Sequence, residues 1–207
     1  MLFVDIYEIL PPKLPAPQAE NRASGPSQTS CNCPFPCSPN DRYNNLMTAI
    51  AIPLVKFLTV ETCPADWKPF DLYLIRDDQI AFYVGQSQCA FARVWEHLHG
   101  GIHGHSIVGR FILVNWPKSA KFTVELLASC SARFAALGYQ VDSAERELIE
   151  QYAPCFNVSL NRQPTPIPPE YLPPNAPIQR LKSFRRMLRE AAVAAARMNS
   201  ARDTEWG

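Results

Sequence analysis

The chain has 207 residues, a formal net charge of +1 and a hydrophobic content of 47%. This length suits one ordinary domain with appendages or two very small domains, and the apolar content suffices for a packed core. The nearly neutral total excludes a protein that attracts polyanions through its overall charge, so any nucleic-acid partner must meet a local cluster of basic residues.

The N-terminus lacks the features of an export signal. The first residues, "MLFVDIYEIL", are apolar, but they carry Asp5 and Glu8, have no basic start and continue into "PPK". The longest apolar run, "LMTAIAIPLV", is too short to cross a bilayer and contains Pro53. The number of cysteines, seven, is odd. Together these features predict a reduced, cytoplasmic protein without a membrane partner.

Residues 1–43 are expected to form an N-terminal segment outside the folded domain. Between residues 11 and 42 the chain is rich in Pro, Ser, Asn and Gln, a composition that predicts a mobile, disordered arm. The motif "CNCPFPC" brings Cys31, Cys33 and Cys37 together, and Cys63 could complete a four-thiolate zinc site. The usual C-x2-C pairs are absent, so unpaired cysteines in a mobile arm are preferred over zinc as the interpretation.

Residues 44–162 are predicted to form the folded domain. Apolar residues return between Asn44 and Val60 as a short helix or strand. "DLYLIR" and "IAFYVG" then flank the turn-like "DDQ", which predicts a β-hairpin. A three-residue loop would place Tyr73 directly opposite Tyr83 on one face of the pair.

After the hairpin the hydrophobic period changes to that of a helix. One face of this predicted helix is an apolar stripe of Phe91, Val94, Trp95 and Leu98. Another face carries Cys89, Arg93 and His97, spaced four residues apart. The following "HLHGGIHGH" has the glycine content of a flexible loop over the site and contains three more histidines, His99, His103 and His105.

Two further elements complete the predicted domain. "KFTVELLA" predicts a strand, and "DSAERELIEQYAP" predicts a helix that begins at Asp142 or Ser143 and ends before proline. Glu145 lies three and four residues before Leu148 and Ile149, so its carboxylate is expected at the edge of the buried stripe. On this helix alone, a capping box with Asp142 is the better interpretation. The alternative is a metal ligand or an acid–base group.

Residues 163–207 are predicted to contain a Pro-rich strap, Gln163 to Pro177, and a basic helix. In this helix an apolar stripe would dock on the folded domain or on a second copy, giving a homodimer; its members are Leu181, Phe184, Leu188 and Ala192. The residues that would bind nucleic acid precede the first acidic residue and are Arg180, Lys182, Arg185, Arg186 and Arg189.

Taken in order, these elements resemble the signature of the GIY-YIG nuclease family over residues 70–160. "DLY" stands where the family has GIY, and "YVG" stands where it has YIG. Arg93 follows the second tyrosine by ten residues, Glu145 begins an E-x-x-L-I element, and Asn157 closes it twelve residues later. Asp71 replaces the glycine of the first tripeptide, which would distort the site entrance or place another carboxylate near it.

The resemblance implies an α+β fold, with a small mixed or antiparallel β-sheet flanked by helices, and a metal-dependent endonuclease that acts on DNA. The implied site contains Tyr73, Tyr83, Arg93, His97, Glu145 and Asn157. One Mg²⁺ or Mn²⁺ held by Glu145 would polarise the phosphate, Arg93 would bind its oxygens, and Tyr73 would act as general base. Tyr83 and His97 would orient water or phosphate, and Asn157 would tie the helix exit to the site.

Two other functions fit the same sequence. A catalytically inactive relative would keep the fold as a nucleic-acid-binding or protein-interaction module. A zinc-dependent interaction protein would use the cysteine-rich arm, with the hairpin domain as a scaffold. Each candidate residue also has an ordinary structural role, since strand tyrosines are commonly core residues and helix arginines are commonly solvated.

Overall fold

The computed structural model describes residues 49–177 and 184–204. The chain separates into two compact units, Met1–Pro34 and Phe35–Gly207, and every described residue belongs to the second unit. Several predictions from the sequence lie outside the described residues: the N-terminal arm, Cys31, Cys33, Cys37, Arg180, Leu181 and Lys182.

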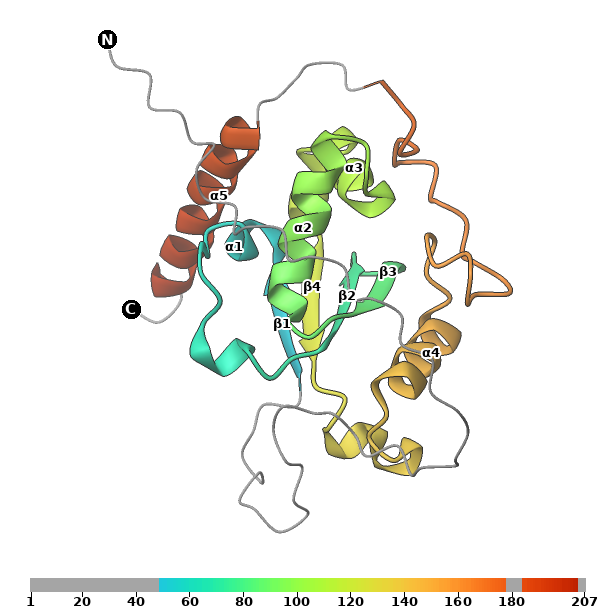
Figure 1. Ribbon diagram of the computed structural model, residues 1–207. Coiled ribbons are helices and arrows are strands. Elements are labelled where there is room, and N and C mark those ends of the chain that lie inside the picture. Colours follow the sequence, from blue (N-terminus) through green and yellow to red (C-terminus); the bar gives the residue numbers. More distant parts are fainter. Residues whose placement is uncertain (1–48, 178–183, 205–207) are drawn as a thin grey trace, which may run out of the picture. The chain divides into compact units, whose positions relative to one another are not determined.

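A four-stranded antiparallel sheet forms the centre of the second unit (Figure 1). Its strands, in spatial order, are β1 (Ala49–Pro53), β4 (Thr123–Leu127), β2 (Leu72–Arg76) and β3 (Ala81–Gln86). The predicted α+β fold with a small antiparallel sheet is confirmed, as are the hairpin and the strand in "KFTVELLA". The described part of the segment between Asn44 and Val60 contains both β1 and a one-turn helix, α1 (Leu54–Phe57).

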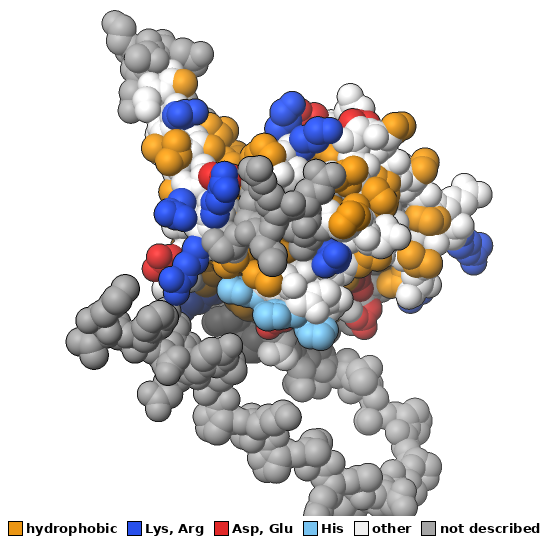
Figure 2. All heavy atoms as spheres, turned by 90° about the horizontal axis from the view of Figure 1, so that it is seen from above, with side chains coloured by type: hydrophobic (Ala, Val, Ile, Leu, Met, Phe, Trp, Pro, Cys, Tyr) orange, Lys and Arg blue, Asp and Glu red, His pale blue; other side chains and the backbone are white. Residues whose placement is uncertain are grey.

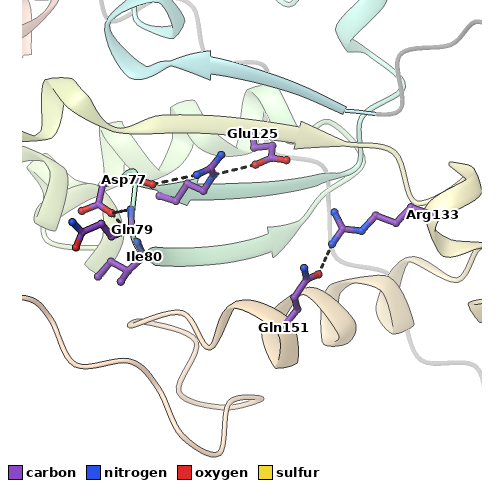
Figure 3. Close-up of polar contacts among 7 residues, drawn as sticks. Asp77, Gln79, Ile80, Glu125, Arg133 and Gln151 are labelled. Carbon is purple, nitrogen blue, oxygen red and sulfur yellow. Dashed lines mark hydrogen bonds and ion pairs between the residues drawn. The ribbon is translucent and has the colours of Figure 1, made fainter.

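The hairpin turn is shaped by the side chain of Asp77. Its carboxylate accepts the backbone N–H groups of Gln79 and Ile80, each at 2.8 Å (Figure 3). Beside the turn, Arg76 of β2 pairs with Glu125 of β4 at an N–O distance of 3.2 Å. The loop that the Asp77 carboxylate stabilises runs from Asp77 to Ile80, and it is longer than the predicted three-residue loop.

This longer connection changes the register of the hairpin. Tyr73 pairs with Gly85, Ile75 pairs with Tyr83, and the register shifts after Ile75. The prediction that Tyr73 lies directly opposite Tyr83 was therefore wrong. The two tyrosines are diagonal neighbours on the same face of the sheet, which still lets large rings touch.

The two faces of the sheet bury separate apolar clusters. On one face, Tyr73 and Ile75 of β2 lie in a core with α2 (Ala90–Ile102) and α3 (Ile107–Val114). On the other face, Leu72 and Leu74 pack with α4 (Val141–Tyr152). Because side chains alternate along a strand, β2 needs helices on both sides to be fully buried. Each fully buried aliphatic side chain contributes about 1.5–3 kcal/mol.

Within the described residues, short 3-10 helices link these elements: η1 (Ala65–Trp67), η2 (Lys118–Lys121) and η3 (Ala132–Leu137). Arg133 of η3 donates a hydrogen bond to the Gln151 side chain, which fastens η3 to α4 (Figure 3). The apolar stripe predicted for α2 is confirmed, because Phe91, Val94 and Leu98 are buried and Trp95 is partly buried against the same core.

The glycine- and histidine-rich stretch is mostly helical, so the prediction of a flexible loop there was wrong. α2 continues to Ile102, and α3 follows Ser106, whose hydroxyl accepts the N–H of Gly109. Gly101 in this stretch, and Gly109 in α3, are needed for space. A Cβ at Gly109 would collide with the carbonyl of His97, and a Cβ at Gly101 would collide with the backbone at Gly109. The two helices therefore cross in close contact.

Helix α4 begins one or two residues earlier than predicted. Its N-cap is Gln140, which makes no side-chain capping hydrogen bond. Glu145 thus lies too far into the helix to complete a capping box with Asp142, and that interpretation was wrong. The predicted end is confirmed, because Ala153 adopts a left-handed conformation with φ of 42° just before Pro154.

The Pro-rich strap, Gln163 to Pro177, contains no helix or strand and is fixed by side chains of the sheet-and-helix core. Asn115, at the end of α3, accepts the N–H of Leu172 at 2.7 Å and donates to its carbonyl at 2.9 Å. Tyr171 packs its ring edge against Phe82, with 5.4 Å between the ring centroids. The strap therefore contributes an aromatic side chain to the core.

Helix α5 (Phe184–Thr204) packs against the same core as α1. Its buried residues are Met187, Ala191 and Ala195. Phe184 and Leu188 are partly buried, as predicted, but Ala192 is exposed. The buried face of α5 is therefore rotated around the helix axis relative to the predicted apolar stripe. Among the helices in the described part of the chain, none is long and apolar enough to cross a membrane.

Candidate active site

The two tyrosines of the hairpin form one side of the candidate site. Their rings lie on the same face of the sheet with centroids 6.0 Å apart. Tyr73 is almost completely buried, with 1% of its surface exposed, and its ring covers Gly85. A Cβ at Gly85 would overlap the Tyr73 hydroxyl and ring. The glycine of "YVG" therefore clears the space that the first tyrosine occupies.

Helix α2 brings His97 against both tyrosines. His97 Nε2 lies 2.8 Å from the Tyr73 hydroxyl, at hydrogen-bond distance. Its ring also meets the Tyr83 ring edge-on, with centroids 5.2 Å apart. The other ring nitrogen, Nδ1, lies 2.8 Å from the hydroxyl oxygen of Ser106. His97 is thus held at both nitrogens, with one bond to the hairpin and one to the start of α3.

The electrostatic environment keeps both partners of this hydrogen bond neutral. Burial raises the pKa of Tyr73, the neighbouring Tyr83 adds to this, and the charge of Arg93 opposes it. Burial, followed by the positive charge of Arg93, lowers the pKa of His97 to about 4. At neutral pH the pair is therefore a phenol beside an uncharged imidazole.

Arg93 lies one helical turn before His97 at the mouth of the site. Its Nη1 atom pairs with Glu96 Oε2 at 2.6 Å, but the two side chains are 47% and 63% exposed. An ion pair with this exposure contributes little to stability, so the guanidinium can exchange Glu96 for another anion at small cost. The positive charge of Arg93 also lowers the pKa of Tyr73 against the effect of burial, which places the guanidinium close to that hydroxyl.

These side chains border a cavity of about 300 Å³ between α2, α3 and the hairpin. Its lining residues are Tyr83, Arg93, Glu96, His97, Gly100, His105, Ser106, Ile107 and Val108. Three predicted site residues, Tyr83, Arg93 and His97, therefore share one cavity. Tyr73 does not line the cavity, but it is hydrogen-bonded to His97, which does. Three exposed histidines, His99, His103 and His105, follow His97 in the sequence. Figure 2 shows histidine side chains gathered on one face of the molecule.

Glu145 approaches the site from the opposite face of the sheet. It projects from α4, which packs on the edge strand β3, and it is half-buried. After burial, the Glu145 charge is the main cause that raises the pKa of Tyr83, so the two groups are close. Burial, and then the charge of Asp142, raise the pKa of Glu145 itself. Glu145 is thus near Tyr83, but it does not line the 300 Å³ cavity that Arg93 and His97 border.

The residues present fit a lightly held divalent cation better than a closed metal cage. The described residues contain no group of three or more His, Cys, Asp or Glu side chains placed to hold a metal ion. Mg²⁺ commonly uses one or two carboxylates, and takes its remaining ligands from water and substrate phosphates. Within the described chain no hydrogen bond or ion pair occupies the Glu145 carboxylate, which leaves its oxygens available for that mode of binding.

Asn157 and Asp71 have structural partners. The Asn157 side chain accepts the N–H of Val84 at 2.9 Å and donates to its carbonyl at 2.7 Å. It therefore closes the exposed edge of β3 and ties the exit of α4 to the site. The Asp71 carboxylate accepts hydrogen bonds from the backbone N–H and the hydroxyl of Ser129. Asp71 thus fixes the loop after β4 at the start of the hairpin.

Sequence reasoning missed Ser106 and Glu96 as members of the site, whereas His105 was expected in a loop over it. Ser106 precedes the apolar run "IVGRFILV", and a serine at that position is a signal for a helix N-cap. That signal could have located the start of α3. Its contact with His97 depends on how α2 and α3 cross, which the local sequence does not specify.

No family model matches this chain, and no curated protein or solved structure matches it significantly. The similarity to GIY-YIG nucleases therefore stays a prediction from the ordered residues described above.

Proposed function

We propose that this protein is a metal-dependent endonuclease that hydrolyses phosphodiester bonds in DNA, as its resemblance to the GIY-YIG family implies. The observation that carries the proposal is the convergence of Tyr83, Arg93 and His97 on one cavity, with Tyr73 hydrogen-bonded behind His97. These residues come from a hairpin and the following helix, and an unrelated packing role would not require all of them to meet around open space.

Each residue at the cavity has a role in the hydrolysis. Arg93 exchanges Glu96 for the non-bridging oxygens of the scissile phosphate, which its planar fork of donors suits. Tyr73 is buried and does not line the cavity, so the attacking water must enter beside Arg93 for Tyr73 to take its proton. The hydrogen bond to His97 then gives that proton a further acceptor. Tyr83, between His97 and Glu145, orients the water or the phosphate.

The Glu145 carboxylate would hold the cation, Mg²⁺ or Mn²⁺. When bound, such an ion polarises the phosphate and stabilises the departing oxygen. Glu145 is close to Tyr83 at the edge strand β3, so a phosphate bound by Arg93 on one side could meet a metal ligand on the other. Asn157 keeps this edge in place through its two hydrogen bonds to Val84.

The outer face of α5 supplies a surface for the DNA backbone. Arg185, Arg186 and Arg189 are exposed there, while the inner face of α5 packs on the core. Arg186 pairs with Glu190 at 2.8 Å, and this pair is partly exposed and can open to a phosphate. The packing of the inner face supports docking on the same domain, and it leaves the arginines of the outer face available.

Cleavage of plasmid DNA tests the proposal. The purified protein should convert supercoiled plasmid to open-circular and linear forms with Mg²⁺ or Mn²⁺, and a chelator should stop the reaction. Glu145→Gln should abolish cleavage, whereas Glu147→Gln, on the same helix, is the matched control and should behave as the wild type. Equal nicking by the wild type and Glu145→Gln would show that Glu145 takes no part in cleavage and would refute the assignment.

One observation favours a second candidate, a DNA-binding module without catalysis. Glu145 lies outside the cavity that Arg93 and His97 border. In such a module Arg93 and the α5 arginines would bind phosphates, and no cation would be required. DNA binding that is independent of divalent cations, with no cleavage of duplex, single-stranded or branched substrates, would support this function instead.

A further inference from the structure

Ser106 makes a contact that an ordinary helix cap does not need. As the N-cap of α3, its hydroxyl oxygen accepts the N–H of Gly109 at 3.1 Å. The same oxygen lies 2.8 Å from His97 Nδ1, although Ser106 is only 8% exposed. The close crossing of α2 and α3, where a Cβ at Gly109 would collide with the His97 carbonyl, brings the cap and the imidazole together.

The direction of the two hydrogen bonds depends on which His97 nitrogen carries the proton. The charge of Arg93 lowers the pKa of Tyr73, and its guanidinium has only donors, so Arg93 offers no acceptor to the Tyr73 proton. Our assignment gives that proton to His97 Nε2, which lies 2.8 Å from the Tyr73 oxygen. A neutral imidazole that accepts at Nε2 carries its proton on Nδ1, and this proton points at the Ser106 oxygen. Ser106 then accepts two hydrogen bonds, one from Gly109 and one from His97.

We infer that Ser106 is a positioning residue: it holds His97 in the Nδ1–H tautomer, so that Nε2 is free to accept the Tyr73 proton. The consequence for catalysis rests on the proposed nuclease function. The assigned hydrogen-bond order does not, because it concerns only contacts within the chain.

In the hydrolysis step this order makes His97 the final proton acceptor. The water oxygen forms a bond to phosphorus, and the bond from phosphorus to the leaving oxygen breaks. The water gives a proton to the Tyr73 oxygen, and Tyr73 gives its own proton to His97 Nε2. The leaving oxygen takes a proton from solvent, and His97 later returns its extra proton to solvent. Tyr73 stays a neutral phenol at the end of the step, so no free tyrosinate is needed.

A spectroscopic experiment tests the tautomer without any DNA. Long-range proton–nitrogen NMR correlations of ¹⁵N-histidine-labelled protein distinguish a protonated Nδ1 from a protonated Nε2. The wild type should show His97 protonated at Nδ1, and Ser106→Ala should move population to the Nε2–H form. Ser106→Thr keeps the hydroxyl and should restore the wild-type spectrum. Protonation of wild-type His97 at Nε2, or an unchanged tautomer in Ser106→Ala, would overturn the inference.

Loss of the helix cap alone could lower activity through stability, so a matched control is needed. Ile112→Val removes one methylene from the buried core of α3 and does not border the cavity. It should lower the melting temperature as Ser106→Ala does, but leave both the His97 tautomer and the cleavage rate unchanged. If Ile112→Val shifts the tautomer as much as Ser106→Ala, the effect belongs to helix stability and the inference is refuted.

The cleavage assay then separates this inference from the proposed function. Ser106→Ala should lower kcat about tenfold or more with little change in KM, because the base is misoriented while the phosphate contacts remain. Ser106→Thr should recover most of the rate. A wild type with the expected tautomer but no nuclease activity would refute the nuclease and leave the hydrogen-bond order standing. Active wild type and equally active Ser106→Ala would overturn the positioning role while the nuclease survives.

Discussion

The depressed pKa of His97 makes the stability of the fold depend on pH in a measurable way. Burial, and then the positive charge of Arg93, lower this pKa from 6.5 to about 4. Between these values the unfolded chain binds a proton at His97 that the folded protein does not bind. The free energy of unfolding therefore rises with pH through this window, and it falls as pH drops from about 6.5 towards 4.

The size of the effect follows from the shift. Between pH 7 and pH 5, a fully expressed shift of this size would lower the free energy of unfolding by about 2 kcal/mol. Because the His97 ring is only partly buried, solvent screening reduces this, and we expect about 1 kcal/mol. The side chain of His97→Gln does not titrate in this range. The variant should therefore lose about 1 kcal/mol less stability than the wild type over the same interval.

Urea unfolding at pH 7, 6 and 5, followed by circular dichroism, measures this difference. Titration of the other groups affects both proteins and cancels in the comparison. His103→Gln, at an exposed histidine, is the matched control for the loss of an imidazole and should follow the wild type. Equal pH dependence of the wild type and His97→Gln would refute the conclusion that the fold keeps His97 neutral. If acidification stabilised the wild type relative to His97→Gln, folding would raise the pKa of His97 instead of lowering it.

Four further changes test the proposed site. Glu145→Gln should lower cleavage at least about a hundredfold with DNA binding retained; activity near normal in nicking assays would show that the carboxylate holds no catalytic cation. Tyr73→Phe removes only a hydroxyl, so the fold should survive while single-turnover cleavage slows by about two to four orders of magnitude. Arg93→Lys should be similarly severe, because a point charge cannot reproduce the planar fork, and normal turnover in both variants would remove the proposed site. Replacing the α5 arginines Arg185, Arg186 and Arg189 together by Gln should reduce the slope of log K against log salt by about two to three units. An unchanged slope in titrations at several salt concentrations would leave these arginines without a part in binding.

The α5 prediction uses charge substitutions because the helix cannot be removed cleanly. Met187 and Ala191 are buried in the same core as the sheet. Deleting the chain after Pro177 would expose that core, and lower affinity could then follow from unfolding. Gln at the exposed positions keeps the helix and changes only the charge.

The elements that carry hydrophobic periodicity could be predicted from the sequence. The alternation in "DLYLIR" and "IAFYVG" gave the hairpin, and the spacing of Phe91, Val94 and Leu98 gave α2 with Arg93 and His97 on another face. These features are local, since a strand buries every second side chain and a helix buries one stripe. The approach of His97 to the tyrosines follows once both elements are placed on one face of the sheet.

The features that depend on contacts between distant segments could not be predicted. Asp77 caps the turn through its side chain, and this changed which residue faces Tyr73. Gly101 lies in a stretch with the composition of a loop, but it is a glycine because the backbones of two helices touch there. The same crossing places Ser106 on His97. The sequence does not distinguish a glycine in a flexible loop from a glycine that lets two backbones pack closely, and only the packing does.

The position of the site at the edge strand explains how groups from both faces of the sheet can act together. Tyr83 and Val84 are consecutive on β3, so their side chains point to opposite faces, one to His97 and one to the core under α4. In the middle of a sheet these faces would be separated by paired strands. At the edge, Glu145 on α4 is close enough to raise the pKa of Tyr83. An edge strand also offers unpaired backbone groups that would attract other chains, and Asn157 occupies those of Val84. The same asparagine thus protects the edge and fixes the strand on which both halves of the proposed site depend.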